Sequence, residues 1–356
     1  MTSELSSLCS YAKGKVSVDT LSKRNYVSTE NMVPNKGGIV DAGALPSAQY
    51  TQQYMKDDIL VSNIRPYFKK IWMADDDGGC SNDVLVFRAE CGCDSTFLYY
   101  VLANDAFFNY ASATSKGTKM PRGDKTAIMQ YEVPCFTHET QLRIGKLLRS
   151  IDDRITVNKK INDNLQQQAQ AIYSSMFIDN PDPAWSHGHL SDLITVKYGK
   201  DHKKLADGIY PVYGSGGIMR YVERPLYNKE SVLIPRKGTL NNVMYVNQPF
   251  WSVDTMFYTE MKLPNVAKFV YHFVKAKDLA SMNAGSAVPS MTTDILNAME
   301  VVIPSASALE EFESLVAPMY EAMEANDVQS KALSQMRDTL LPKLMSGEID
   351  VSAVQL

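Results

Sequence analysis

Two long stretches of the chain repeat apolar residues at alternating intervals of four and three. This spacing is typical of a coiled-coil seam, in which one stripe of each helix packs against a partner helix. The stretches cover residues 137–178 and 307–348, and together they restrict the possible folds more than any other feature. The seam residues that we expect to pair are Ile144, Leu148, Ile151, Ile155, Asn158, Asn162, Leu165 and Ile172 in the first helix, and Phe312, Val316, Met319, Met323, Asn326, Leu333, Leu340 and Leu344 in the second.

Each seam is interrupted near its middle by polar residues. Asn158 and Asn162 interrupt the first seam, and Asn326 and Ser330 interrupt the second. If the two helices pair in antiparallel orientation, these polar positions meet at the centre. A buried polar layer lowers stability but sets the register of the pair. The alternative is that each helix packs only on its own globular neighbour, as most amphipathic helices do.

The sequence between the seams is an internal repeat with diverged residues. The prolines of residues 179–183 cannot continue the first helix, so a second domain begins there. Short motifs then recur in the same order about 170 residues apart. The recurring pairs are residues 59–65 with 232–238, Gly117 with Gly285, Pro121 with Pro289, and residues 133–134 with 303–304.

We therefore predict an α+β fold in which two mixed α/β-type domains are separated by an antiparallel pair of long coiled-coil helices, with pseudo-twofold symmetry. The predicted boundaries are a first domain at 1–136, a helix at 137–178, a second domain at 179–306, a helix at 307–348 and a tail at 349–356.

Several local features are also predicted. We expect a helix over residues 95–111, a Thr137 cap on the first long helix, and a capping box of Ser307 and Glu310 on the second. Pro318 should bend the second helix or set its true start.

Composition and motifs exclude several classes of function. The chain shows no Walker loop, no nucleophile elbow, no His-Glu-x-x-His motif and no Asn/Asp-Pro-Pro-aromatic motif of amino-methyltransferases. Its five cysteines lack paired metal-ligand spacing, so no metal site is expected. No apolar run is long enough for a membrane span, which leads us to expect a cytoplasmic protein without a membrane partner. The net charge of −4 requires any grip on nucleic acid to be local or shared with a partner.

Cationic and amide side chains gather at corresponding points of both repeats. Cations bind phosphates, whereas Arg, Asn, Gln and Lys on loops can reach base edges. Taken singly, such residues are more often solvated surface groups, but their recurrence in both repeats favours nucleic-acid binding. The candidates are Asn63, Arg65, Lys69, Lys70, Lys116, Lys119 and Arg122 in the first domain, and Tyr213, Ser215, Arg220, Arg236, Lys237, Asn241 and Asn242 in the second.

With these features the chain resembles the specificity subunits of type I restriction-modification systems. The most specific matching stretches are residues 58–62, 151–155, 210–217 and 340–349. The resemblance implies that two target recognition domains each read one half of a bipartite double-stranded DNA target, while the paired helices set the spacer. It also implies that the chain performs no chemistry and holds no cofactor.

In that family, two methyltransferase subunits dock on the helices and bind S-adenosylmethionine, and restriction subunits use ATP and Mg²⁺. Two alternatives follow from the residues alone. One is a coiled-coil scaffold whose end domains bind peptide or RNA. The other is an enzyme with an unfamiliar site, such as a nuclease built on scattered Asp, Glu and Lys.

Overall fold

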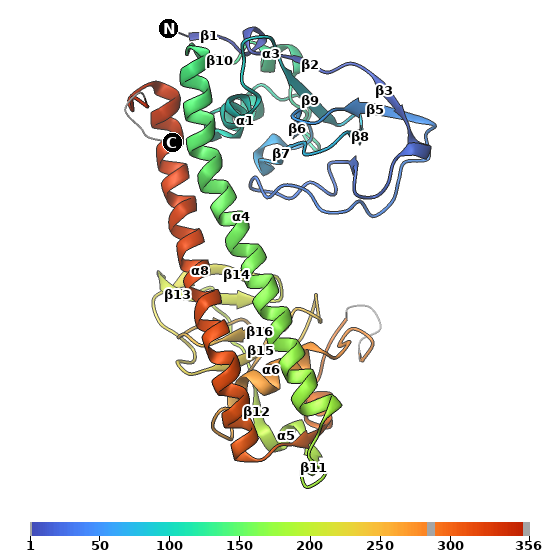
Figure 1. Cartoon of the computed structure of the whole chain (residues 1–356), viewed down its shortest axis with the longest axis vertical. Helices are drawn as coiled ribbons and strands as arrows, with labels where there is room; N and C mark the ends of the chain where they lie inside the picture. Colours follow the sequence, from blue (N-terminus) through green and yellow to red (C-terminus); the bar gives the residue numbers. More distant parts are fainter. Residues whose placement is uncertain (1, 283–288, 352–356) are drawn as a thin grey trace. The chain divides into compact units, whose positions relative to one another are not determined.

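The computed structural model describes residues 2–282 and 289–351. Its residues group into two compact units, one formed by Met1–Asn158 with Asp327–Leu356 and the other by Lys159–Asn326. Each unit contains one mixed α/β domain and a segment of each long helix, α4 (His138–Ser174) and α8 (Ala306–Ser346) (Figure 1).

The domain of the N-terminal unit contains two four-stranded sheets, with strand orders β2-β9-β6-β7 and β3-β5-β8-β4, and a separate β1-β10 pair. Its strands are β1 (Thr2–Glu4), β2 (Cys9–Tyr11), β3 (Lys15–Ser17), β4 (Tyr26–Val27), β5 (Tyr50–Tyr54), β6 (Ile59–Ser62), β7 (Ile71–Met73), β8 (Gly78–Cys80), β9 (Val84–Ala89) and β10 (Glu132–Pro134). Its helices are η1 (Leu5–Ser7), η2 (Val18–Thr20), η3 (Pro66–Phe68), α1 (Ser95–Ala103), α2 (Asp105–Ala113) and α3 (Lys125–Met129).

The domain of the second unit contains a four-stranded sheet with the order β12-β18-β15-β16, a three-stranded sheet with the order β14-β13-β17, and a β11-β19 pair. Its strands are β11 (Ser186–His189), β12 (Ile194–Tyr198), β13 (Asp207–Gly214), β14 (Gly217–Val222), β15 (Ser231–Pro235), β16 (Met244–Val246), β17 (Trp251–Ser252), β18 (Met256–Met261) and β19 (Glu300–Ile303). Its helices are α5 (Leu190–Leu193), α6 (Ala267–Lys275) and α7 (Thr293–Asn297), and a π-helical turn, η4 (Ser175–Asp179), follows α4.

The two domains repeat one order of elements, which confirms the predicted internal repeat. β2, β6, β7 and β9 occupy the same places in their sheet as β12, β15, β16 and β18 in theirs. In chain order, the last strand of this sheet is β9 in one domain and β18 in the other. Each is followed by a helix (α1 or α6), later by a short helix (α3 or α7), then by a strand that pairs with the start of the domain (β10 or β19), and finally by a long helix. Gly285, which the sequence matched to Gly117, lies outside the described residues.

The long helices run antiparallel within each unit, as predicted for the fold. In the N-terminal unit, the Asn158 side-chain amide donates to the Ser330 hydroxyl over 3.1 Å. In the second unit, Asn326 donates to Asn162 over 2.8 Å, and Asn162 donates to the Met323 carbonyl over 3.1 Å. Residue numbers therefore rise along one helix while they fall along the other, and polar seam residues face each other in both units.

The seam is buried most deeply where a domain covers it. Ile144 and Leu148 pack with Leu344 in the core of the N-terminal unit, and Phe312 and Val316 lie in the core of the other. Ile155, Leu165, Met319, Met323, Leu333, Leu340 and Ile172 are only partly buried. A pair of helices without a third element cannot enclose its seam, so the domains supply much of the burial.

Two local predictions need correction, and one alternative of a third is excluded. The helix expected over residues 95–111 is two helices, because Asn104 has an extended backbone and its side chain caps α2 by accepting from the Ala106 N–H. Helix α8 begins before the expected capping box, at Ala306, and the Ser305 hydroxyl accepts from the Ala308 N–H. The helix continues through Pro318, so this proline does not set its start. The Thr137 cap on α4 is confirmed, since its hydroxyl accepts from the Thr140 N–H.

None of the helices in the described part of the chain is both long and apolar enough to cross a membrane. The same residues contain no cluster of three or more His, Cys, Asp or Glu side chains suited to a metal ion.

Candidate nucleic-acid interface

In the N-terminal domain, two loops that the sequence singled out lie against each other. One follows β6 and carries Asn63 and Arg65, and the other covers residues 115–123. The Arg65 N–H donates to the Pro121 carbonyl over 2.8 Å, and the Arg65 guanidinium donates to the Lys119 carbonyl over 3.4 Å. Asn63 is 7% exposed, so it supports the loops from within rather than facing solvent.

Most cations of this surface are held by neighbouring acceptors. Lys69 pairs with Asp105 over 2.8 Å, and Lys36 pairs with the other oxygen of the same carboxylate over 2.8 Å. Burial acts to raise the pKa of Asp105, but the hydrogen bonds from both lysines outweigh it, so that pKa lies below its usual value. These contacts orient the lysine side chains before any ligand arrives.

Three other cations have partners as well, namely Lys70 with the Thr29 carbonyl, Arg122 with Asp83, and Lys116 with Asp124. Arg122 uses two nitrogens on the carboxylate, at 3.0 and 3.3 Å. A phosphate that approaches Arg122 must share it with Asp83. Lys119 lies at the exposed tip of its loop.

In the C-terminal domain, the corresponding loop also joins a second one. Residues 236–242 follow β15, and the Asn242 amide donates to the Ser215 carbonyl in the β13–β14 turn over 2.8 Å. Gly217 in this turn has φ +109°, a conformation that favours glycine. Asn241 donates to Asp278 over 3.0 Å and also accepts from the Ala280 N–H.

The remaining candidates of this domain differ in exposure. The Arg236 guanidinium lies over the Tyr198 ring, 5.3 Å from its centroid, and Arg220 is paired with Asp207 over 2.7 Å. Lys237 is exposed. Tyr213 is buried, and its hydroxyl accepts from Gln248, so it is a core residue that supports the hairpin.

The sequence candidates overlook two aromatic side chains of the N-terminal domain. Tyr67 and Phe68 lie between Arg65 and Lys69 in η3, and they are 52% and 39% exposed. In the sequence, these two aromatic residues follow a proline and lie between basic residues. This pattern could have indicated exposed rings on a turn.

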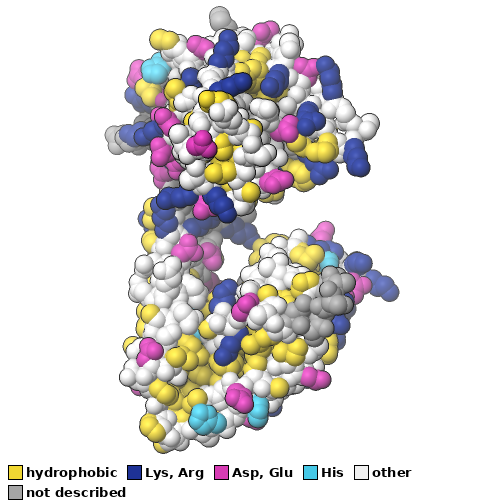
Figure 2. All heavy atoms as spheres, turned by 90° about the vertical axis from the view of Figure 1, so that its right-hand side faces the viewer, with side chains coloured by type: hydrophobic (Ala, Val, Ile, Leu, Met, Phe, Trp, Pro, Cys, Tyr) yellow, Lys and Arg dark blue, Asp and Glu magenta, His cyan; other side chains and the backbone are white. Residues whose placement is uncertain are grey.

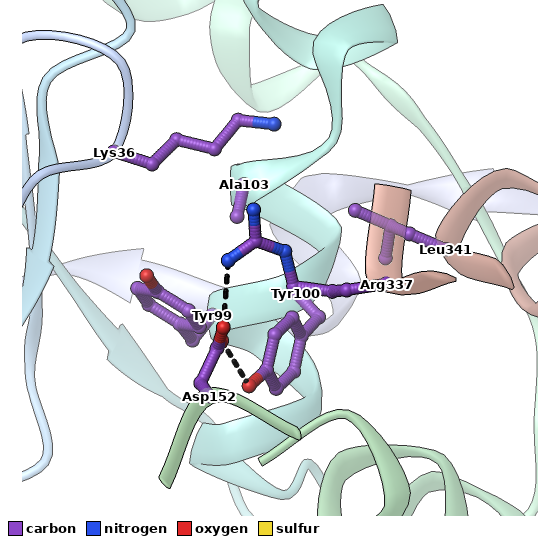
Figure 3. A pocket seen from close by; sticks show the side chains of 7 residues that line it. All are labelled: Lys36, Tyr99, Tyr100, Ala103, Asp152, Arg337 and Leu341. Carbon is purple, nitrogen blue, oxygen red and sulfur yellow. Dashed lines mark hydrogen bonds and ion pairs between the residues drawn. The ribbon is translucent and has the colours of Figure 1, made fainter. Parts of the chain in front are cut away.

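A polar junction attaches the N-terminal domain to both long helices (Figure 3). The Tyr100 hydroxyl of α1 donates to Asp152 of α4 over 2.7 Å, and Arg337 of α8 donates to the other carboxylate oxygen over 2.6 Å. Both side chains point at the Asp152 carboxylate beside a small cavity also lined by Lys36, Tyr99, Ala103 and Leu341. The cavity suits a water molecule better than a substrate. We therefore interpret the junction as a structural contact that holds α1 against α4 and α8.

The second unit has a corresponding junction around His272 of α6. Its Nδ1–H donates to the Gln170 side-chain oxygen over 2.8 Å, and its Nε2 accepts from the Tyr320 hydroxyl over 2.9 Å. Burial lowers the pKa of His272 to about 4, so the ring is neutral at pH 7.

On the face shown in Figure 2, the charged side chains do not form one continuous basic patch. Figure 2 shows Lys and Arg side chains interspersed with acidic and hydrophobic ones on the face that it presents. This agrees with the overall net charge of −4. Any attraction for phosphates must therefore come from local groups such as the paired loops.

Comparisons with known proteins agree with this description. The family model described as type I restriction modification DNA specificity domain matches residues 1–167 and 184–312. A type I restriction enzyme specificity subunit of Methanocaldococcus jannaschii, MjaIX, is 24% identical over 304 residues, which are 73% of this chain and 70% of that protein. The HindI specificity subunit of Haemophilus influenzae is 21% identical, and the alignment covers 91% of this chain and 94% of that protein.

A solved structure supports the fold. The S subunit of a type I restriction-modification system from M. genitalium superposes with a TM-score of 0.62 at 19% identity, covering 97% of this chain and 96% of that one. The comparisons support a role in DNA sequence specificity; they support neither a peptide- or RNA-binding scaffold nor catalysis by this chain. The chain therefore belongs to the family of type I restriction-modification DNA specificity subunits.

Proposed function

We propose that this chain reads a bipartite target in double-stranded DNA, with one half-site for each domain. The observation that carries the proposal is that corresponding strands end in loops with the same chemistry. Arg65 follows β6, Arg236 follows β15, and each loop contacts a second polar loop of its own domain. Loops of this kind can place guanidinium and amide groups at base edges while neighbouring lysines meet phosphates.

We further propose that the long helices bind two methyltransferase subunits, through which restriction subunits join. Apolar side chains on the outside of the helices support this, since Val157 is 43% exposed, Val328 65% and Met336 51% within the N-terminal unit. Single exposed apolar side chains are common on protein surfaces, so the support lies in their shared position on the two long helices. S-adenosylmethionine, ATP and Mg²⁺ then belong to the partner subunits, and the complex acts in the cytoplasm.

The first test is a genome-wide map of methylated adenine with and without this gene. Loss of methylation at one split motif with a constant gap is the expected result, and an unchanged map in a strain with an active methyltransferase subunit contradicts the assignment.

Exchange of residues 1–136 for the equivalent domain of a relative tests modularity. It should change one half of the motif only, and exchange of residues 179–306 should change the other half. Unaltered specificity after either exchange would rule out independent reading by the two domains.

A further inference from the structure

Two aromatic rings project from the N-terminal domain beside its candidate DNA-binding loops. Tyr67 and Phe68 belong to the one-turn helix η3, and their ring centroids lie 4.8 Å apart. Tyr67 is 52% exposed and Phe68 39%. Two adjacent aromatic rings so accessible to water form an apolar projection that the packing of the domain does not account for.

The backbone that presents these rings is strained and tightly held. Arg65 and Lys69, on either side of η3, have φ +51°, and Asn35 and Lys36 have φ +56° and +61°. The N–H of Asn35 donates to the Phe68 carbonyl, and the N–H of Lys36 donates to the Lys69 carbonyl, each over 2.8 Å. Residues other than glycine adopt this region only when the surroundings impose it, and such positions cluster at functional sites.

Side-chain contacts add to the rigidity of the turn. The Asp105 carboxylate at the start of α2 binds the ammonium groups of both Lys36 and Lys69. Pro66 at the first position of η3 fixes one more backbone angle. The turn that carries the rings is therefore rigid, and we expect it to keep its conformation when the rings contact a ligand.

The surroundings of the rings indicate the nature of that ligand. Arg65 precedes them, Lys69 follows them, and the loop bearing Lys119 is hydrogen-bonded to Arg65. An apolar projection flanked by cations is complementary to a polyanion with apolar faces between its charges. Duplex DNA has this composition, whereas an apolar protein surface would offer no negative charge to Arg65 or Lys119.

Within the described residues, the pair of exposed rings on a strained turn occurs in the N-terminal repeat alone. After β15 the corresponding residues are 236–240, which contain no aromatic side chain, and Leu240 there is buried. Gly238 has φ +88° and occupies this turn without strain. The described part of the C-terminal domain also has no helix corresponding to α2. The arginine-bearing loop is thus shared by both domains, whereas the aromatic projection distinguishes the N-terminal domain.

Resting on the function proposed above, we propose that Tyr67 and Phe68 act as an aromatic wedge at a base step of the half-site read by the N-terminal domain. The wedge partially unstacks that step, so recognition there depends on how easily the step deforms as well as on hydrogen bonds to base edges. Flexible pyrimidine–purine steps should be favoured at this position.

The test uses the chain assembled with its methyltransferase subunit and a random duplex library. The sequences selected by the wild-type complex define both half-sites. 2-Aminopurine then replaces, one at a time, each adenine on either strand of the half-site read by the N-terminal domain, except the adenine that is methylated, because a methyltransferase flips its target base out of the stack. Wild-type binding should raise the fluorescence at one step. The variant with Tyr67→Ala and Phe68→Ala should lose this rise and bind the selected duplex about tenfold more weakly or worse.

Three controls separate the wedge from other roles of the loop. The slope of affinity against salt should not change in the double variant, because neither ring neutralises a phosphate. Tyr67→Phe should retain the fluorescence rise. Tyr50→Ala removes a ring with 54% exposure on β5 of the same unit and should leave binding unchanged.

Different outcomes contradict different parts of the argument. A double variant that selects the same sequences and gives the same fluorescence would overturn the wedge alone. A double variant that assembles less completely, while the assembled fraction keeps full discrimination, would assign the rings to a protein interface and would also overturn the wedge. A wild-type complex without sequence preference would overturn the proposed function together with the wedge.

Discussion

Asp152 and Arg337 form an ion pair between the two long helices, with 2.6 Å between the carboxylate oxygen and the guanidinium nitrogen. Tyr100 of α1 joins the same carboxylate, so three segments far apart in sequence meet at one side chain. His272 has the equivalent place in the second unit. Both Tyr100 and His272 are the sixth residues of their helices, and both bind side chains of the long helices. In each unit, the sixth residue of the corresponding helix (α1 or α6) therefore takes part in the polar contacts that hold the domain against both long helices.

Arg337→Met should lower the free energy of unfolding by about 1–3 kcal/mol. The substitution removes charge-assisted hydrogen bonds and leaves the partly buried Asp152 carboxylate without its cation. Urea unfolding measures the change. Tyr100→Phe combined with Arg337→Met completes a double-mutant cycle, and we expect non-additive losses because both residues bind one carboxylate. Purely additive losses would show that the junction is not cooperative.

His272 should make stability depend on pH. Its pKa is lowered to about 4 in the folded chain from about 6.5 in the unfolded chain, so between these values the unfolded state binds more protons. The stability that His272 contributes is therefore fully present above about pH 6.5 and is lost as the pH approaches 4, by on the order of 3 kcal/mol.

His272→Gln tests this pH dependence, since an amide can donate to Gln170 and accept from Tyr320 without titrating. Urea unfolding between pH 4 and pH 7 should show a shallower dependence for the variant. Equal slopes for variant and wild type would assign the acid sensitivity to other groups.

The polar contact between Asn162 and Asn326 should contribute to register at the expense of stability. Replacing both residues with Leu should raise the free energy of unfolding by about 1 kcal/mol or more, because the amides no longer need to be buried. Replacing Asn162 alone should lower it, since Asn326 then faces a hydrocarbon side chain. Urea unfolding gives these energies, and hydrogen exchange along α4 and α8 should reveal a less uniform register in the double variant.

Lys119→Gln should weaken DNA binding to all sequences alike, because an exposed ammonium at a loop tip is suited to a phosphate. The slope of log affinity against log salt should become shallower by about 0.9. Lys56→Gln is the matched control, as Lys56 is exposed but precedes β6, whereas the candidate loop follows that strand. A change in base preference at one position would instead make Lys119 a base-reading residue.

The amino-acid sequence by itself determined the long helices, their matching seams and the duplicated order of elements. These features depend on periodicity and on short motifs, which act locally or recur at regular distances. The seam from Ile144 to Ile172 needed no knowledge of tertiary contacts, because one helical face carries all of it. The cap at Thr137 is local for the same reason, being made within four residues.

Only the tertiary structure decided what the individual polar residues do. Asn63 and Tyr213 have side chains typical of a binding surface, yet the fold buries both. Arg122 and Arg220 are cations in the sequence, but carboxylates from other segments hold them. Tyr67 and Phe68 look like core residues, and the strained turn that exposes them is maintained by Asn35 and Lys36 from a distant loop. Burial and pairing result from contacts between segments far apart in the chain, and a local pattern carries no information about such contacts.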